Sequence, residues 1–359
     1  MVSLLAASSG TAPGVARPPA IRRVRSRPSH RATAGPPTLA RHRRLHDTSR
    51  SHDTCRTTGF RVKATDGSDE TAEVPSALME PIPTKLNRVP HPRELRQYFY
   101  KLGVKSVKGA VEAGESRMQL RVTIPELNPE MDVYRIGTLL EMVREIAAVL
   151  AQDGLRVKVC VQQALGQGFF TGMPLSLSGV RRILEMMDWG EAASFVALGQ
   201  VGEDQIDDET AVYILIAPQN VVNGAVIYEL SDMVDAAEAK GKQVVLINPI
   251  LKDVPSSGGM MGVRGRAERL DFANSFVSAG HFRLLYKAGT FYPIVGALRY
   301  VYGGPWEVSK RVDINKYEEQ YQVIGSYDEE PDAVAITKCF EAYRKIQRKK
   351  EAEAYRARF

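Results

Sequence analysis

The sequence predicts an α/β fold: a three-layer, Rossmann-like domain with a mainly parallel sheet, preceded by a disordered transit segment. Two short apolar runs rich in β-branched residues, at 212–217 and 244–247, are typical of strands that are buried on both faces. Between them Val226, Leu230 and Val234 recur at helical spacing. Together the three segments predict a βαβ unit, which is the building block of a parallel sheet.

The elements before this unit follow from the same periodicities. An apolar stripe from Ile136 to Leu150 predicts the clearest helix, and Asp153-Gly154 ends it. We expect Gly103 to separate two helical pieces. The other expected elements are helical segments at 93–102 and 104–112, strands at 118–124, 156–161 and 193–198, and a helix that carries Val180, Ile183, Leu184 and Met187.

After residue 270 the patterns are less regular. The expected elements are a helix to about residue 278, strands at 282–286 and 291–294 joined by a turn at 287–290, and edge strands at 307–312 and 321–327. A last helix begins near Asp332. Its packed face is expected to consist of Val334, Ile336, Phe340, Tyr343 and Ile346.

Polar turns follow both strands of the central βαβ unit. In an open parallel sheet such strand ends face the crevice where ligands bind. Glycines and serines in the loop at 248–269 can turn donors onto an anion, and arginine forks can hold phosphate or carboxylate. The alternative is that these arginines form ion pairs at a helix start. The candidate ligand- or anion-binding residues are Gln219, Asn220, Asn248, Ser256, Ser257, Arg264, Arg266 and Arg269.

No catalytic residue, metal ligand or cofactor is assigned from the sequence. The glycines at 166–172 are spaced one residue too widely for a dinucleotide fingerprint, so a plain connection is favoured. The acidic run at 203–209 lacks the ligand positions of a calcium loop and is expected to be a solvated turn. His281 is expected to be a hydrogen-bonded histidine at a sheet boundary, and Cys160 and Cys339 are expected to be buried thiols.

Charge divides the chain into regions. Residues 1–63 contain 13 Lys and Arg but only two acidic residues, and they lack the apolar core of a secretory signal. We interpret residues 1–64 as an organelle transit peptide, 65–92 as an acidic, Pro-rich linker, and 93–330 as the α/β domain. A basic arm that binds nucleic acid is the alternative for the first segment, but the mildly acidic remainder argues against a nucleic-acid partner.

The last segment, 331–359, is a basic helix. Between Lys338 and Arg358 it has 8 basic and 3 acidic residues, so it is either solvated or in peripheral contact with an anionic membrane surface. No transmembrane segment is expected, because no apolar run approaches the length that spans a bilayer.

Six motifs follow one another between about Leu120 and Arg311. They are TIPEL at 123–127, IAPQN at 216–220, INPILKD at 247–253, RGRAER at 264–269, HFRLLY at 281–286 and GGPWEV at 303–308. In this order they resemble a plastid and cyanobacterial family of unknown function. The same domain resembles the C-terminal extension of a chloroplast adenylate kinase and stromal factors needed for photosystem II accumulation. When this resemblance is added to the composition of residues 1–64, that segment is expected to be a chloroplast transit peptide.

The resemblance implies a chloroplast location, in the stroma with thylakoid association, and a link to thylakoid complex biogenesis. No adenylate kinase phosphate loop is present, so kinase activity is not implied. We expect a non-catalytic protein that supports the assembly, accumulation or regulation of photosynthetic complexes by binding thylakoid or photosystem assembly proteins. The alternative is an enzyme or sensor that holds a nucleotide or another phosphorylated small molecule at the loop 248–269.

Overall fold

The structure is a computed structural model that describes residues 80–128, 131–162, 177–220, 226–251, 265–287, 293–315 and 318–358. The chain divides into two compact units, residues 1–71 and 72–359, and every described residue belongs to the second unit. The predicted transit peptide therefore lies outside the described residues, and so does most of the predicted linker.

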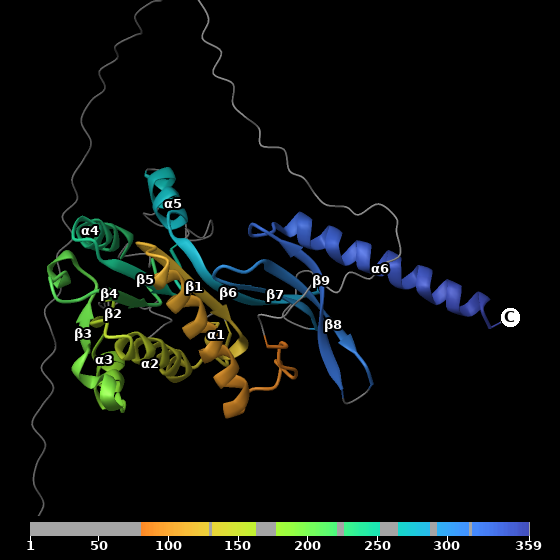
Figure 1. The fold of residues 1–359 in the computed structure, drawn as a ribbon, viewed down its shortest axis with the longest axis horizontal. Coiled ribbons are helices and arrows are strands. Elements are labelled where there is room, and N and C mark those ends of the chain that lie inside the picture. Colours follow the sequence, from red (N-terminus) through yellow and green to blue (C-terminus); the bar gives the residue numbers. More distant parts are fainter. Residues whose placement is uncertain are drawn as a thin grey trace, which may run out of the picture. The chain divides into compact units, whose positions relative to one another are not determined.

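The second unit is built on one sheet, whose nine described strands have the order β3-β2-β4-β5-β1-β6-β7-β8-β9 (Figure 1). Neighbours from β3 to β6 pair in parallel, whereas β6 to β9 pair antiparallel. The predicted mainly parallel sheet is confirmed. The strands are β1 (Arg117–Thr123), β2 (Val157–Val161), β3 (Val196–Gln200), β4 (Val212–Ile216), β5 (Gln243–Ile247), β6 (Val277–Tyr286), β7 (Ile294–Val301), β8 (Trp306–Asp313) and β9 (Glu319–Tyr327).

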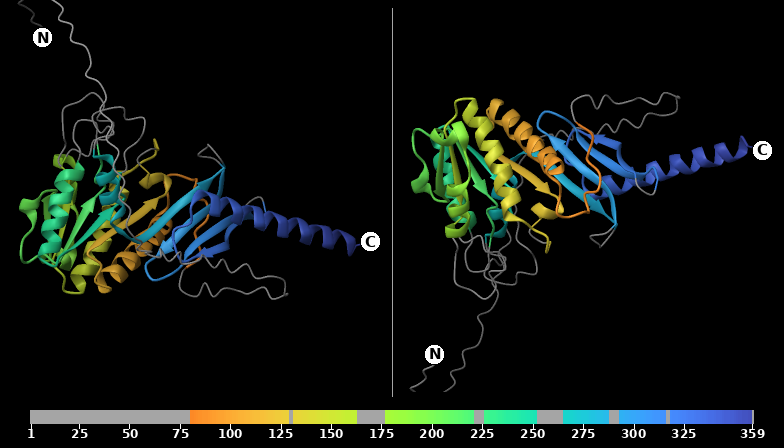
Figure 2. Two further views of the ribbon diagram at one scale, coloured as in Figure 1. Left: turned by 90° about the horizontal axis from the view of Figure 1, so that it is seen from above. Right: turned by 90° about the horizontal axis from the view of Figure 1, so that it is seen from below.

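Helices cover both faces of this sheet, which confirms the predicted three layers. Figure 2 shows α1, α2 and α3 on one face and α4, α5 and α6 on the other, in agreement with the hydrophobic clusters that each set forms. The helices are α1 (Arg93–Glu112), α2 (Ile136–Gln152), α3 (Leu177–Met186), α4 (Val226–Ala239), α5 (Arg266–Asn274) and α6 (Ala333–Arg356), with short 3-10 turns η1 (Pro125–Leu127), η2 (Gly190–Ser194) and η3 (Glu203–Gln205).

The central strands are apolar because both of their faces are covered. Ile214 and Ile216 of β4 pack into the cluster with α1 and α2, while Tyr213 and Leu215 pack against α4. All five residues of β4 are buried. The continuous run of β-branched residues in β4 is therefore explained by burial of both faces of the strand, as expected.

The predicted break in the first helix is wrong, because α1 runs without interruption through Gly103. A Cβ atom at this position would lie 3.2 Å from Leu120 Cδ2 and 3.3 Å from Ile146 Cδ1. The glycine therefore serves close packing of α1 against β1 and α2. Its cost in helix propensity, about 1 kcal/mol relative to alanine, is offset by these tertiary contacts.

Three predicted boundaries are also wrong. The helix expected to reach residue 278 ends at Asn274, and β6 already begins at Val277, where it pairs with β1. The strand expected at 291–294 lies later, since β7 begins at Ile294. In the same way β3 begins at Val196, after a 3-10 turn that includes residues 193 and 194. In each case pairing with a neighbouring strand decides where the element begins.

Only part of the predicted face of α6 packs on the sheet. Ile336 and Phe340 are buried, together with Cys339, against Trp306 and its neighbours. Val334 and Ile346, also predicted to pack, are 57% and 54% exposed. A helical stripe becomes buried only where another element lies opposite, and the contacts of α6 are with β8 and β9.

Both cysteines of the described part, Cys160 and Cys339, are buried free thiols, as expected. Burial raises the pKa of Cys160 to about 12, so it remains a protonated thiol at neutral pH. Across the described ranges, none of the helices combines the length and the apolar character needed to cross a bilayer.

Candidate functional site

The turn after β4 is held by the chain around it. The main-chain N–H of Gln219 donates to Gln162 Oε1 at 2.8 Å, and Gln162 Nε2 donates to the Gln219 carbonyl at 3.0 Å. Asn220 Nδ2 donates to the Leu251 carbonyl at 2.7 Å, and its Oδ1 accepts from the N–H of Ile227 at 3.2 Å. The Asn220 amide therefore ties the end of β4 to the chain after β5 and to α4.

The side chain of Asn248 also forms hydrogen bonds with main-chain groups of neighbouring segments. Its Oδ1 accepts from the N–H of Val122 at 2.7 Å, and its Nδ2 donates to the carbonyls of Val122 at 3.0 Å and Leu127 at 3.4 Å. The residue is buried and has a left-handed backbone, with φ of 48°. This side chain continues the pairing between β5 and β1 past the last main-chain pair, so its polar groups are already satisfied.

The remaining predicted binding residues are only partly described. Ser256, Ser257 and Arg264 lie outside the described residues. Arg266 is the exposed first residue of α5, whereas Arg269 is buried and its Nη1 donates to Tyr228 Oη of α4 at 3.3 Å. The structure thus brings Gln219, Asn220 and Asn248 together, and the ligand site at this loop stays a prediction.

The acidic turn at 203–209 is bound to basic side chains. Burial raises the pKa of Asp207, but hydrogen bonds from Lys158 at 2.5 Å and from the N–H of Thr210 at 2.7 Å outweigh it and hold this pKa well below its usual range. Asp208 pairs with Lys240 at 2.8 Å. The described ranges contain no group of three His, Cys, Asp or Glu placed to hold a metal ion. The glycine loop at 166–172 lies outside them.

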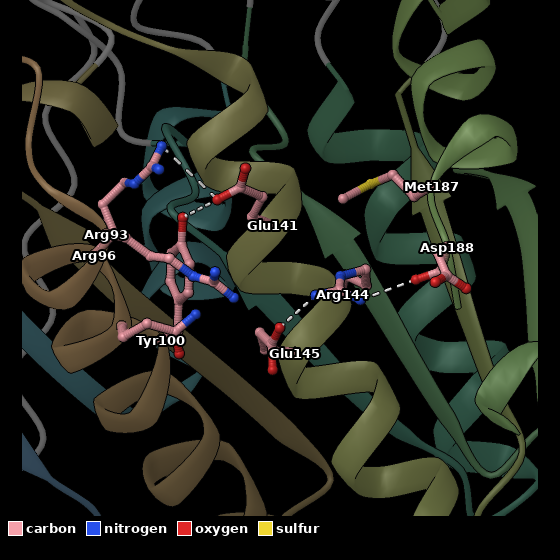
Figure 3. Close-up of a pocket in the computed structure, with 9 residues that line it drawn as sticks. Arg93, Arg96, Tyr100, Glu141, Arg144, Glu145, Met187 and Asp188 are labelled. Atoms are coloured by element: carbon pink, nitrogen blue, oxygen red, sulfur yellow. Dashed lines mark hydrogen bonds and ion pairs between the residues drawn. The ribbon is translucent and has the colours of Figure 1, made fainter. Parts of the chain in front are cut away.

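A hollow of about 380 Å³ lies where α1 meets α2, near the end of α3 (Figure 3). Tyr100 Oη donates to Glu141 Oε2 at 2.6 Å, and burial raises the pKa of this tyrosine. Arg144 Nη1 donates a hydrogen bond to the main-chain carbonyl of Asp188 at 2.9 Å. The remaining lining residues named in Figure 3 are Arg93, Arg96, Glu145 and Met187. Paired charges of both signs suit a polar or zwitterionic group. This hollow could not be predicted from the sequence, because its residues come from separate helices.

The two histidines of the described part differ from expectation. His91, placed in the linker by the sequence, is buried, and its main-chain N–H donates at 2.7 Å to the carboxylate of the fully buried Glu126. His281 lies inside β6 and not at a sheet boundary, and its Nε2 is buried with no hydrogen-bond partner among the described residues. Burial and the charges of Arg283 and Arg121 lower the pKa of His281 to about 3.

The polar residues at the strand ends can be recognised in the sequence. That the side-chain amides of Asn220 and Asn248 form hydrogen bonds with main-chain groups cannot be recognised there.

A family model with the description "domain of unknown function (DUF1995)" matches residues 94–338. This match extends over most of the chain and over every described strand, from α1 into α6. The chain therefore belongs to the DUF1995 family.

Proposed function

We propose that this protein is a non-catalytic chloroplast stromal protein that supports the assembly, accumulation or regulation of photosystem II-type complexes. It acts by binding an acidic surface of a thylakoid assembly protein through the second half of α6. The chloroplast address rests on the composition of residues 1–64 and on the resemblance of the six motifs to the plastid family.

The observation that carries the proposal is the geometry of α6. Its buried residues end at Phe340, and residues 344–356 are exposed except for the half-buried Gln347. We call residues 344–356 the basic half of α6. It carries six basic and two acidic side chains. Helix-forming Ala, Glu, Lys and Arg dominate it, and Lys349 pairs with Glu353 one turn later at 3.8 Å, which supports a helix whose side chains are largely exposed.

A helix of this kind is suited to recognition by charge. Basic side chains along an exposed helix attract an acidic partner surface and speed its encounter. The exposed Ile346 adds an apolar contact among these charges. By contrast, the polar groups at the strand ends are largely occupied within the chain, which favours partner binding over a ligand site there.

The alternative proposal keeps the phosphorylated small molecule at the loop 248–269. Its support is the exposed Arg266 at the start of α5 and the side-chain amide of Gln219, which makes no hydrogen bond within the described part of the chain. The following experiment tests whether the protein binds its partner through α6, as the first proposal requires.

The experiment measures sedimentation of the protein with isolated thylakoid membranes. Lys345 and Arg348 lie on the basic half of α6, and the double variant Lys345→Glu/Arg348→Glu is expected to lose most binding, since it inverts the charge while Glu keeps the helix. Binding by the unchanged protein should weaken as salt rises. The matched control is Arg182→Glu/Arg266→Glu, which makes the same charge change on α3 and α5 and should bind normally.

Two comparisons make the outcome decisive. Protease treatment of the thylakoids should abolish binding, and protein-free vesicles that contain phosphatidylglycerol should bind little. Equal binding to such vesicles would replace the protein partner with a lipid surface. Binding that is unaffected by the α6 variant, or lost in the control variant, would contradict the proposal.

A further inference from the structure

Two arginines and a histidine lie next to one another on the face of the sheet that α4, α5 and α6 cover. Arg121 of β1 is the Cα partner of His281 of β6, and Arg283 follows two residues later. Their side chains therefore leave the sheet on the same side. We call these three residues the Arg–His cluster.

The cluster lies between the areas that α5 and α6 cover. On one side, Gln119 of β1 is bonded to the chain that follows α5, through Nε2 and the Phe276 carbonyl at 3.1 Å. On the other side, Leu285 of β6 packs in the cluster of apolar residues under α6. Arg121 and Arg283 are half-buried, so solvent reaches them.

The positive charges of the cluster have no close acidic partner in the described part of the chain. Burial lowers the pKa of Arg121 and of Arg283, and Glu330, the acid whose charge acts on both, lies beyond ion-pair distance. The Nε atom of Arg121 is buried, and no described residue forms a hydrogen bond with it. Because a guanidinium does not lose its proton, it keeps a charge that burial penalises.

His281 supplies a second, independent observation that points to a ligand. The residue is only 5% exposed, and its Nε2 is buried with no hydrogen-bond partner among the described residues. Its ring lies 5.2 Å from that of Trp306, which in turn stacks on Tyr300 at 4.5 Å. Packing therefore holds the imidazole beside the two arginines, whereas buried polar atoms in proteins are nearly always paired.

We propose that the Arg–His cluster binds a phosphate-type oxyanion, either inorganic phosphate or the phosphate group of a small metabolite. Guanidinium forks and an imidazole N–H are donors that match the oxygens of a tetrahedral anion. Two net positive charges fit a dianion better than a single carboxylate. The bound anion offsets the burial of both arginines and gives His281 Nε2 its missing partner.

The first test is isothermal titration of the full chain with inorganic phosphate and, separately, with glucose 6-phosphate. Arg121→Gln and Arg283→Gln should each raise the dissociation constant roughly tenfold or more, as expected for the loss of a charge-assisted hydrogen bond. Arg182→Gln, on the opposite face, should leave it unchanged. Binding of phosphate identifies the free ion as sufficient, and binding of the ester alone identifies a metabolite.

The second test cannot be mimicked by misfolding, because it predicts tighter binding. Removing the competing charge with Glu330→Gln should lower the dissociation constant about twofold, because a carboxylate that is not in contact with the anion repels it only weakly through water. Glu329→Gln, its exposed neighbour, should have no effect.

The third test observes the imidazole directly. The charged and titratable groups beside His281 are Arg121 of β1, Arg283 of β6 and Tyr300 of β7. An anion held there opposes the arginine charges, so phosphate should shift the His281 ring resonance, assigned by its loss in His281→Phe. No saturable binding of either compound, equal affinity in the arginine variants, or an unmoved His281 resonance would overturn the proposal.

Discussion

At the residue scale, polar side chains at strand ends have two uses that a sequence does not separate. Asn248 was predicted to face a ligand, but its amide completes the pairing of β1. The deciding feature is its backbone φ of 48°, which turns the side chain onto the main chain. Such a conformation follows from tertiary contacts and is not visible in residue type.

His281 makes a prediction about stability and pH. Its pKa falls from about 6.5 in the unfolded chain to about 3 in the folded chain, first through burial and then through the charges of Arg283 and Arg121. Below pH 6.5 the unfolded chain binds the proton and the folded chain does not. Stability is therefore fully present above pH 6.5 and is lost as the pH falls toward 3.

Urea unfolding in phosphate-free buffer measures this effect. Between pH 7 and pH 4 the unchanged protein should lose about 3 kcal/mol more of its free energy of unfolding than His281→Phe, which has no titrating ring at this position. Parallel pH profiles for the two proteins would show that His281 is not held neutral by its surroundings.

At the element scale, patterns of apolar residues predicted which elements exist better than where they end. The apolar stripe from Ile136 to Leu150 predicts a helix that ends at Asp153-Gly154, and α2 ends at Gln152, as expected. Gly103 was misread as a break, because glycine marks both helix ends and close contacts between elements. The pairing of β1 with β6 brings together the residues of the Arg–His cluster, which are far apart in the chain. It therefore could not be predicted from patterns of neighbouring residues.

Two glycines near α1 should respond to alanine in opposite ways. A Cβ atom at Gly280 of β6 would lie 2.6 Å from Ser106 Cβ and 2.8 Å from Leu120 Cδ1. Gly280→Ala should therefore cost about 2 kcal/mol of stability through overpacking. At Gly109, inside α1, the nearest atom is Tyr302 Cδ1 at 3.6 Å, so Gly109→Ala should stabilise by about 1 kcal/mol.

Chemical denaturation of both variants is the measurement. A stable Gly280→Ala protein would mean that α1 and β6 do not approach as closely as the structure shows. A destabilised Gly109→Ala protein would mean that Tyr302 lies closer to α1 than the structure shows, so that the added methyl group clashes with it.

At the scale of the whole molecule, the sequence predicted the α/β class and the mainly parallel sheet from two buried strands and the helix between them. It did not predict that α6 extends past the sheet, because an apolar residue such as Ile346 continues the helical stripe whether or not a surface lies opposite. The account of function rests on the exposed charges of the basic half of α6 and on the resemblance of the motifs to the plastid family.

The most direct test of that account is photosystem II content in photosynthetic cells that lack this protein. Reintroducing the full chain should restore photosystem II, whereas Lys345→Glu/Arg348→Glu at equal abundance should not, nor should a chain without residues 1–64. The Arg182→Glu/Arg266→Glu chain should restore it fully. Normal photosystem II in cells without the protein, or full restoration by the α6 variant, would contradict the account.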